Sequence, residues 1–248
     1  MSAKVNKWTM GILLGILALA LSAPMTARGA TARSPVSEAA SKADATFSSN
    51  ALLFIENVGQ FDPRARFQVP AGDRTLWLTE DGLWVVLPER PKAPKAGAEG
   101  PRKGVVIQLS FPGANPHPVL EPFERRATSV NYFLGNDPAR WRTNVPVWGG
   151  VRYRELYPGV DLEVKGEGGR LRLQLVTRAG ADLSAVRLRV EGADSVELLP
   201  EGLRLITAVG AFTLPLLAVE GARPGALPAV IPLGAGGFEV IAPFARTA

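Results

Sequence analysis

The sequence predicts an all-β fold, a sandwich of mainly antiparallel strands with little helix. The main observation is a period-two alternation of apolar and polar residues, which is typical of strands that bury one face. In addition, no long stretch beyond the N-terminal leader keeps the 3.6-residue period of an amphipathic helix. Turns that contain glycine separate the alternating runs, so neighbouring strands are expected to pair as hairpins.

Residues 1–30 have the layout of an export signal. Lys4 and Lys7 precede an apolar run from Met10 to Leu21, and small residues follow it. A membrane-spanning helix needs about 20 apolar residues, so this run is short for one. We expect cleavage between Ala23 and Ala30, and the alternative is an uncleaved N-terminal anchor.

Composition divides the rest of the chain. Residues 31–50 are small and polar without apolar periodicity, and they predict a flexible lead-in. A β-rich extracellular domain is expected over residues 51–248, with packing that begins at Leu52. Within it, residues 88–104 are rich in Pro, Lys, Gly and Ala and contain no large apolar residue. They therefore predict a solvated loop or a short linker.

Each expected element follows from its local pattern. Residues 75–87 predict two strands joined by a Glu-Asp-Gly turn, and residues 196–207 predict a hairpin about Pro200-Glu201-Gly202. Further strands are expected at 104–111, 169–176 and 185–192, and short helical turns at 137–141 and 182–185. The runs at 105–120 and 185–199 resemble each other weakly, which leaves one β unit and two packed β units as alternatives.

Charge and composition exclude several function classes. The net charge of +5 falls to +2 once Lys4, Lys7 and Arg28 leave with the leader, so a nucleic-acid partner is not expected. The chain has no Cys, which removes thiolate chemistry, Cys-ligated metals and lipoprotein processing. Its one histidine, His117, lies between two prolines in a polar turn, so no metal site and no catalytic triad is expected. We expect no cofactor and no catalytic residue.

Charged residues leave one enzymatic alternative open. Two carboxylates at a suitable separation are sufficient for glycoside hydrolysis, and the candidates are Glu56, Asp62, Asp137, Glu155, Asp161 and Glu163. Alternating acids are also typical of a solvated strand face, which we favour here. Arginines two residues apart recur at 64/66, 140/142, 152/154, 170/172 and 187/189, and they favour a soluble outer sheet face over a site for anionic polymers.

Aromatic residues concentrate in one segment. Residues 131–162 contain all three tyrosines and two of the five tryptophans. Gly135, Asn136 and the Asp137-Pro138 pair predict a tight reversal within it. We favour a structural corner whose rings face inward and fasten one sheet to another. The alternative is an exposed platform for sugar rings or peptide, formed by Trp141, Trp148, Tyr153 and Tyr157.

Several motifs resemble a known domain. They are "FIENVGQFD" at 54–62, "NYFLGNDPARWRTNVPVWGGVRYRELYPGVDL" at 131–162, "GADLSAVRLRVEGADSVELLPEGLRL" at 180–205 and the "GAF" that follows. Together they are similar to an uncharacterised extracellular domain of bacterial surface proteins that usually precedes β-propeller type SBBP repeats. The resemblance implies no catalytic residues. That family continues into the repeats, whereas this sequence ends at Ala248, so a stand-alone domain and a truncated chain are alternatives.

These observations favour a secreted or cell-surface, non-enzymatic module for interaction or display. Its partner would be a cell-surface protein or a polysaccharide, with membrane contact only through an uncleaved leader. A carbohydrate-binding module that uses exposed aromatic residues is the first alternative, and a carboxylate glycoside hydrolase is the second.

Overall fold

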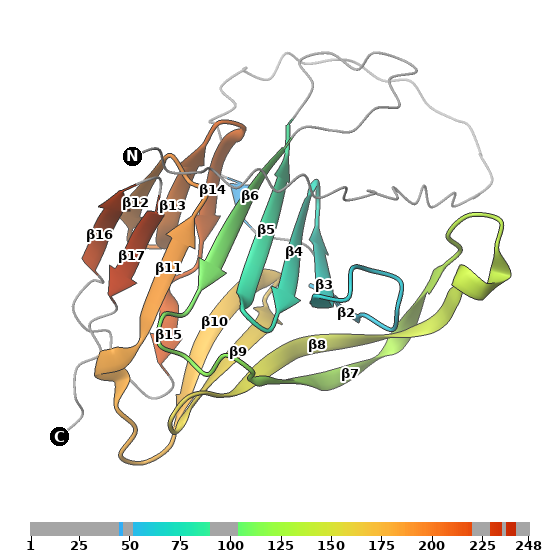
Figure 1. Ribbon diagram of the computed structural model, residues 1–248, viewed down its shortest axis with the longest axis horizontal. Coiled ribbons are helices and arrows are strands. Elements are labelled where there is room, and N and C mark those ends of the chain that lie inside the picture. The colour runs from blue at the N-terminus through green and yellow to red at the C-terminus, as the bar shows by residue number, and fades with distance from the viewer. Residues whose placement is uncertain (1–44, 47–51, 90–103, 220–228, 235–236, 242–248) are drawn as a thin grey trace, which may run out of the picture. The chain divides into compact units, whose positions relative to one another are not determined.

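The computed structural model describes residues 45–46, 52–89, 104–219, 229–234 and 237–241 (Figure 1). Most of this part of the chain is β-strand, which confirms the all-β prediction. The only helical elements within it are two 3-10 turns, η1 (Pro138–Arg140) and η2 (Leu183–Ala185). The strands are β1 (Ala45–Thr46), β2 (Phe54–Glu56), β3 (Ala65–Ala71), β4 (Arg74–Thr79), β5 (Gly82–Pro88), β6 (Gly104–Ser110), β7 (Val119–Tyr132), β8 (Arg142–Tyr157), β9 (Val160–Glu167), β10 (Arg170–Thr177), β11 (Arg187–Glu191), β12 (Ser195–Leu199), β13 (Gly202–Thr207), β14 (Gly210–Leu214), β15 (Leu217–Val219), β16 (Ala229–Gly234) and β17 (Gly237–Ile241).

The strands form two sheets. The larger, with 13 strands, has the order β15-β10-β9-β8-β2-β3-β4-β5-β6-β11-β17-β16, with β7 paired to β8. The smaller has the order β1-β14-β13-β12. Two pairs, β1 with β14 and β10 with β15, are parallel, and the other pairs in the described part of the chain are antiparallel.

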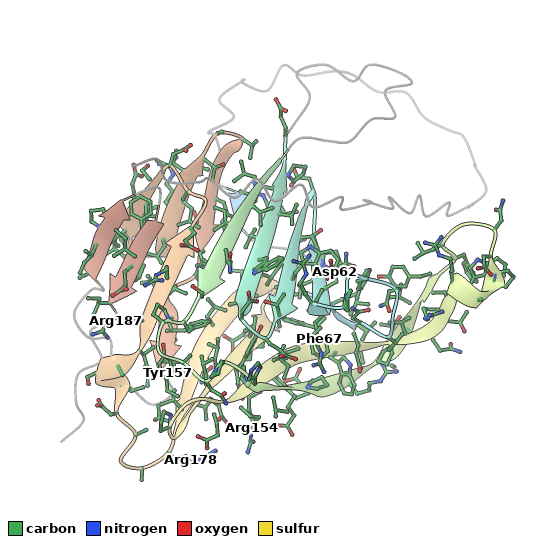
Figure 2. The ribbon with its side chains drawn as sticks, in the orientation of Figure 1. Asp62, Phe67, Arg154, Tyr157, Arg178 and Arg187 are labelled. Atoms are coloured by element: carbon green, nitrogen blue, oxygen red, sulfur yellow. The ribbon has the colours of Figure 1, made fainter. Side chains whose placement is uncertain are left out.

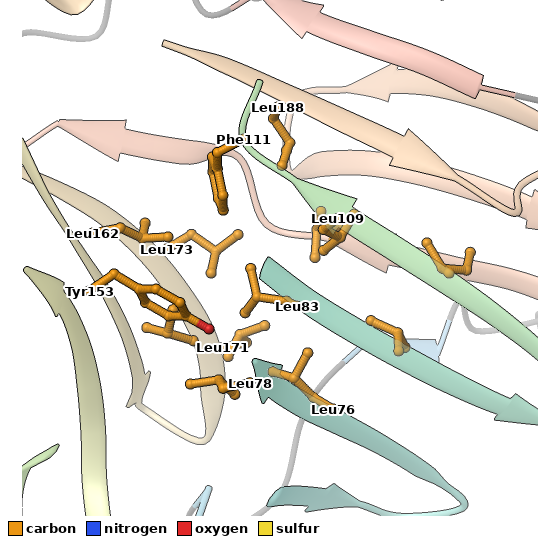
Figure 3. Packing of buried hydrophobic residues seen from close by; sticks show 14 of the residues in the cluster. Leu76, Leu78, Leu83, Leu109, Phe111, Tyr153, Leu162, Leu171, Leu173 and Leu188 are labelled. Carbon is orange, nitrogen blue, oxygen red and sulfur yellow. The ribbon is translucent and has the colours of Figure 1, made fainter. Parts of the chain in front are cut away.

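The core lies where the large sheet faces itself. Figure 3 shows leucines of β4, β5 and β6 pointing toward the side chains of β8, β9 and β10 across a common interior. Leu76, Leu78 and Leu83 are fully buried on one side, and Leu162 and Leu173 are fully buried on the other. The same apolar cluster includes four residues of the smaller sheet, namely Leu203, Leu205, Phe212 and Leu214. The two sheets therefore share one core.

Local patterns predicted most of the short strands. The hairpin of β4 and β5 turns at Glu80-Asp81, and the hairpin of β12 and β13 turns at Pro200-Glu201, as expected. Both short helical turns are also confirmed. Asp137 caps η1 by accepting from the Ala139 N–H, and Asp182 caps η2 by accepting from the Ser184 N–H.

Other predictions fall partly outside the described residues. The leader at 1–30 and most of the lead-in at 31–50 are outside them, although Ala45–Thr46 within that lead-in pairs with β14. Of the expected loop at 88–104, only the ends are described, and there Pro88 pairs with Gly104 as β5 meets β6. Leu52 is buried, as expected for the start of packing. No helix in the described residues is long and apolar enough to cross a membrane.

The expected compact corner at 131–162 is instead a long hairpin. Strand β8 extends over 16 residues and pairs with the 14 residues of β7 (Figure 1). Glu124 in β7 and Glu155 in β8 have φ values of 55° and 50°, and the register shifts near both positions. Such bulges bend the strands without ending them, so one continuous hairpin replaces the predicted compact corner.

Candidate interaction surface

The structure places Tyr153 and Tyr157 inside the molecule. Tyr153 is fully buried and Tyr157 is 3% exposed. The Tyr153 hydroxyl donates to the Gly82 carbonyl at 3.0 Å, which links β8 to β5 across the core. The Tyr157 hydroxyl donates to the Pro112 carbonyl at 3.0 Å. These two residues therefore fasten strands together and cannot belong to a surface platform, which corrects the set of four proposed from the sequence.

Trp148 packs against the main core cluster beside its cross-strand partner Phe54. Its ring is half-buried, and its indole N–H donates to Glu56 Oε2 at 3.0 Å. The Arg125 guanidinium lies 5.4 Å from the ring centroid. Trp141 is seven residues away along an extended chain, which corresponds to roughly 23 Å. The four aromatic residues of the sequence-based platform are thus spread over the hairpin and do not gather in one site.

The end of the hairpin carries an exposed aromatic pair. Phe133 is 53% exposed and Trp141 is 39% exposed. Their rings meet edge to face, with centroids 5.3 Å apart and planes at 88°. The Trp141 indole N–H donates to the Gly135 carbonyl at 3.1 Å. Gly135 has a φ of 70°, a conformation that favours glycine, so the reversal predicted there is present.

A short loop supports the hairpin below its end. In residues 57–64, the Asn57 side chain accepts from the Gly59 and Phe61 N–H groups and donates to the Ala65 carbonyl. The ordered loop presents the Val58 carbonyl to the Arg142 guanidinium at 3.2 Å. Phe61 meets the Tyr132 ring edge to face at 5.2 Å. Residues 133–141 themselves pair with no strand in the described part of the chain.

The candidate carboxylates each have a structural partner. Glu56 accepts from Trp148, Asp137 caps η1, and Asp161 accepts from the Glu155 N–H at 2.7 Å. Glu155 accepts from the Gly159 N–H, and Glu163 accepts from Arg152 at 2.6 Å. Figure 2 shows Arg154 and Arg178, both of which lie within ion-pair distance of Asp161, at 3.7 Å and 3.9 Å. In the described residues, no group of three or more His, Cys, Asp or Glu could hold a metal ion.

Asp62 has a specific electrostatic partner. The Arg64 guanidinium donates to its carboxylate at 2.8 Å, and this hydrogen bond lowers the pKa of Asp62 to about 2. Asp62 therefore remains ionised over the physiological pH range, which suits an ion pair and not a proton donor. His117, the one histidine, is exposed, and its Nδ1 lies 3.7 Å from Glu80 Oε2.

A pocket of about 240 Å³ opens beside the turn between β4 and β5. Asp81, Asn115 and Arg189 line it, and Tyr153 contributes to its wall. The Tyr153 hydroxyl and the Asp81 carboxylate are both engaged within the fold, with Gly82 and Thr79 respectively. These two polar groups thus already stabilise the turn.

All three tyrosines are expected to resist ionisation while the protein is folded. Burial raises the pKa of Tyr132 to about 12, raises that of Tyr157, and raises that of Tyr153 well above its usual value. The pKa of a tyrosine in the unfolded chain is about 10. The stability that depends on keeping the buried tyrosines neutral is therefore complete below about pH 10, and it is lost as the pH rises from there through their raised pKa in the folded protein. Phenolate absorbance should therefore appear only on alkaline unfolding, whereas in denaturant all three should titrate near pH 10. A tyrosine that ionises near pH 10 in the folded protein would contradict the burial.

Fold and surface together define an all-β domain with one long, aromatic-ended hairpin. A family model described as a domain of unknown function (DUF7948) matches residues 54–215, and the chain belongs to this family. The matched range begins at β2 and ends just after β14, so it includes the core and the whole hairpin. No curated protein and no solved structure matches the chain.

Proposed function

We propose that this protein is a non-enzymatic, extracytoplasmic interaction module that presents the end of its β7–β8 hairpin to a partner on the cell envelope. The single observation that carries the proposal is the exposure of Phe133 and Trp141 at the end of a pre-ordered hairpin. Large aromatic side chains contribute much of the binding energy at protein interfaces. Here the pair is held in one geometry before any partner arrives, which lowers the entropic cost of binding.

Two features of the sequence support an extracytoplasmic location. Residues 1–30 have the layout of an export signal, and the motifs at 54–62 and 131–162 are similar to a surface domain that precedes SBBP repeats. A cell-surface protein or a polysaccharide is then the expected partner class. The non-enzymatic reading is consistent with the carboxylates, each of which has a local structural partner.

A carbohydrate-binding surface elsewhere on the domain is the second candidate. Trp77 and Trp84 are cross-strand partners on β4 and β5, and both are half-buried on the outward face of the sheet. Gln68 and Gln108 flank them in the same cross-strand row. However, the Arg64 guanidinium lies 5.4 Å from the Trp84 ring and Phe61 packs against Trp77, so much of both rings is already covered.

The test compares binding of four forms of the exported protein to isolated cell envelopes. The double variant F133S/W141S should bind at least tenfold more weakly than the wild type. The double variant loses the ring–ring contact and the hydrogen bond from Trp141 to Gly135, so its free energy of unfolding should fall by about 1–3 kcal/mol, and it should remain folded. Val119→Ser is the matched control, since Val119 is 68% exposed at the opposite end of the hairpin. No binding by the wild type, or equal binding by F133S/W141S, would refute the proposal. Binding that is lost only in Trp84→Ala would favour the carbohydrate alternative.

A further inference from the structure

The arginines in the described residues fall into two groups, those with a carboxylate partner and those without one. Most form an ion pair, for example Arg66 with Glu80 and Arg172 with Glu167. Among the described residues, the arginines without a carboxylate partner are Arg125, Arg140, Arg142 and Arg170. Three of these four lie on the β7–β8 hairpin. Arg140 and Arg142 lie at its end beside Trp141, and Arg125 lies opposite Trp148 in the middle of the hairpin.

The unpaired arginines of the hairpin differ in how they are held. The Arg142 guanidinium donates to the Val58, Ala139 and Trp141 carbonyls, and that of Arg125 donates to the Arg126, Thr128 and Val147 carbonyls. These bonds fix the position of both guanidinium groups but leave their charges uncompensated. Arg140 makes no such bond and is exposed at the very end. The hairpin end is therefore a positively charged surface, which favours an anionic partner.

Several polar groups at the hairpin end are bonded internally. The Trp141 indole N–H is satisfied by the Gly135 carbonyl. The backbone N–H groups of Ala139, Arg140 and Trp141 donate to Asp137 Oδ1, to the Asp137 carbonyl and to the Pro138 carbonyl. These bonds lower the cost of bringing this part of the segment into contact with an apolar medium.

We propose that the hairpin end docks on the surface of an anionic lipid bilayer, with Phe133 and Trp141 in the interfacial layer and Arg140 and Arg142 at the lipid phosphates. This inference rests on the proposed function and names the partner as lipid. Tryptophan is enriched at membrane–water interfaces, and arginines near an anionic surface strengthen binding. Long arginine side chains keep their charge among the headgroups while aromatic rings lie deeper. The exposed carboxylate of Asp137 limits the contact to this interfacial depth.

The experiment measures co-sedimentation of the exported protein with vesicles of phosphatidylglycerol and phosphatidylcholine in equal parts, and with vesicles of phosphatidylcholine alone. All forms share one N-terminus, so differences between them report on the hairpin. Wild type should bind the anionic vesicles, and F133S/W141S should lose at least tenfold in partitioning. Arg140→Gln should weaken binding about fivefold, whereas Arg170→Gln, which removes an equally unpaired and exposed charge from β10, should not. Binding should also fall between 0.1 M and 1 M salt, where the Debye length shortens from about 10 Å to 3 Å.

Depth is tested with brominated phosphatidylglycerol. The bromines should quench tryptophan emission of the wild type, and Trp141→Phe should keep vesicle binding while losing most of this quenching. Equal binding by wild type and F133S/W141S, or equal weakening by Arg140→Gln and Arg170→Gln, would overturn the inference. If envelopes bind the protein through its hairpin but vesicles do not, the proposed function stands and the lipid partner is wrong. If such envelope binding is competed by a soluble anionic polysaccharide, the partner is that polymer.

Discussion

Replacing Gly82 with alanine is expected to destabilise the domain by more than about 4 kcal/mol, a loss that places it among the most damaging single substitutions. Gly82 begins β5 with a φ of 142°. An alanine Cβ there would lie 2.0 Å from the carbonyl oxygen of Leu109 in β6. That atom belongs to the backbone of a central strand, so it cannot move without breaking the pairing of β5 with β6. The Gly82 carbonyl also accepts from Tyr153 and Thr79, and these bonds would be disturbed as well.

Gly210→Ala is the matched control for this prediction. Gly210 begins β14 with a φ of 128°, and its carbonyl accepts from Thr207 Oγ1 as that of Gly82 accepts from Thr79 Oγ1. A Cβ at Gly210 would meet no atom within 4 Å. Its cost should therefore be backbone strain alone, of order 1–3 kcal/mol. Urea denaturation of the two variants measures both values. Equal losses would show that the contact between β5 and β6 is looser than described.

Local rules were sufficient where a segment has one buried face or a capping side chain. The β4–β5 hairpin alternates Leu76 and Leu78 inward with Trp77 outward, a pattern that is visible in the sequence and fixed by packing. Similarly, the helical turns at 137–141 and 182–185 were predicted, because a short capped turn depends on a few neighbouring residues. These features do not depend on which distant strands come together.

The long hairpin was missed because its sequence lacks those local signals. Strand β7 is exposed along most of its length, so its residues do not alternate between apolar and polar. In β8, Pro146 and the Gly149-Gly150 pair resemble turn residues, yet all three lie within the strand. The Phe123 ring covers Gly150, where an added Cβ would meet Phe123 at 2.4 Å. Only this partner strand explains why glycine is placed there.

The position of the candidate surface depends on which face of a strand each side chain occupies and on how far apart the residues lie along the hairpin. Neither can be read from composition. Tyr153 and Tyr157 are buried in the core, while Trp148 is half-buried against it and bonds to Glu56. Residues of the motif at 54–62 meet residues of the motif at 131–162 through the pairing of β2 with β8 and the bond from Arg142 to Val58. The two motifs thus build the support of the hairpin. Phe133 and Trp141 are exposed because the hairpin extends beyond that support.

Removing the Tyr153 side chain is expected to cost about 3–5 kcal/mol, the range for large aromatic residues replaced by alanine in a core. Tyr153 is fully buried, and it connects β8 with β5 across the interior. Tyr153→Phe keeps the ring and removes only the hydrogen bond to the Gly82 carbonyl. It should cost about 1–2 kcal/mol, because that carbonyl still accepts from Thr79.

Tyr157→Phe provides the comparison, since the Tyr157 hydroxyl also donates to a carbonyl at 3.0 Å but the ring lies at the edge of the core. Tyr157→Phe and Tyr153→Phe should lower the free energy of unfolding by similar amounts. The further loss from Tyr153→Phe to Tyr153→Ala then measures the packing of the Tyr153 ring alone. Thermal and urea unfolding give these free energies, and hairpin-dependent binding should survive in every variant that remains folded. A loss of binding in folded Tyr153→Phe would mean that the interior of β8, and not the exposed end of the hairpin, controls partner recognition.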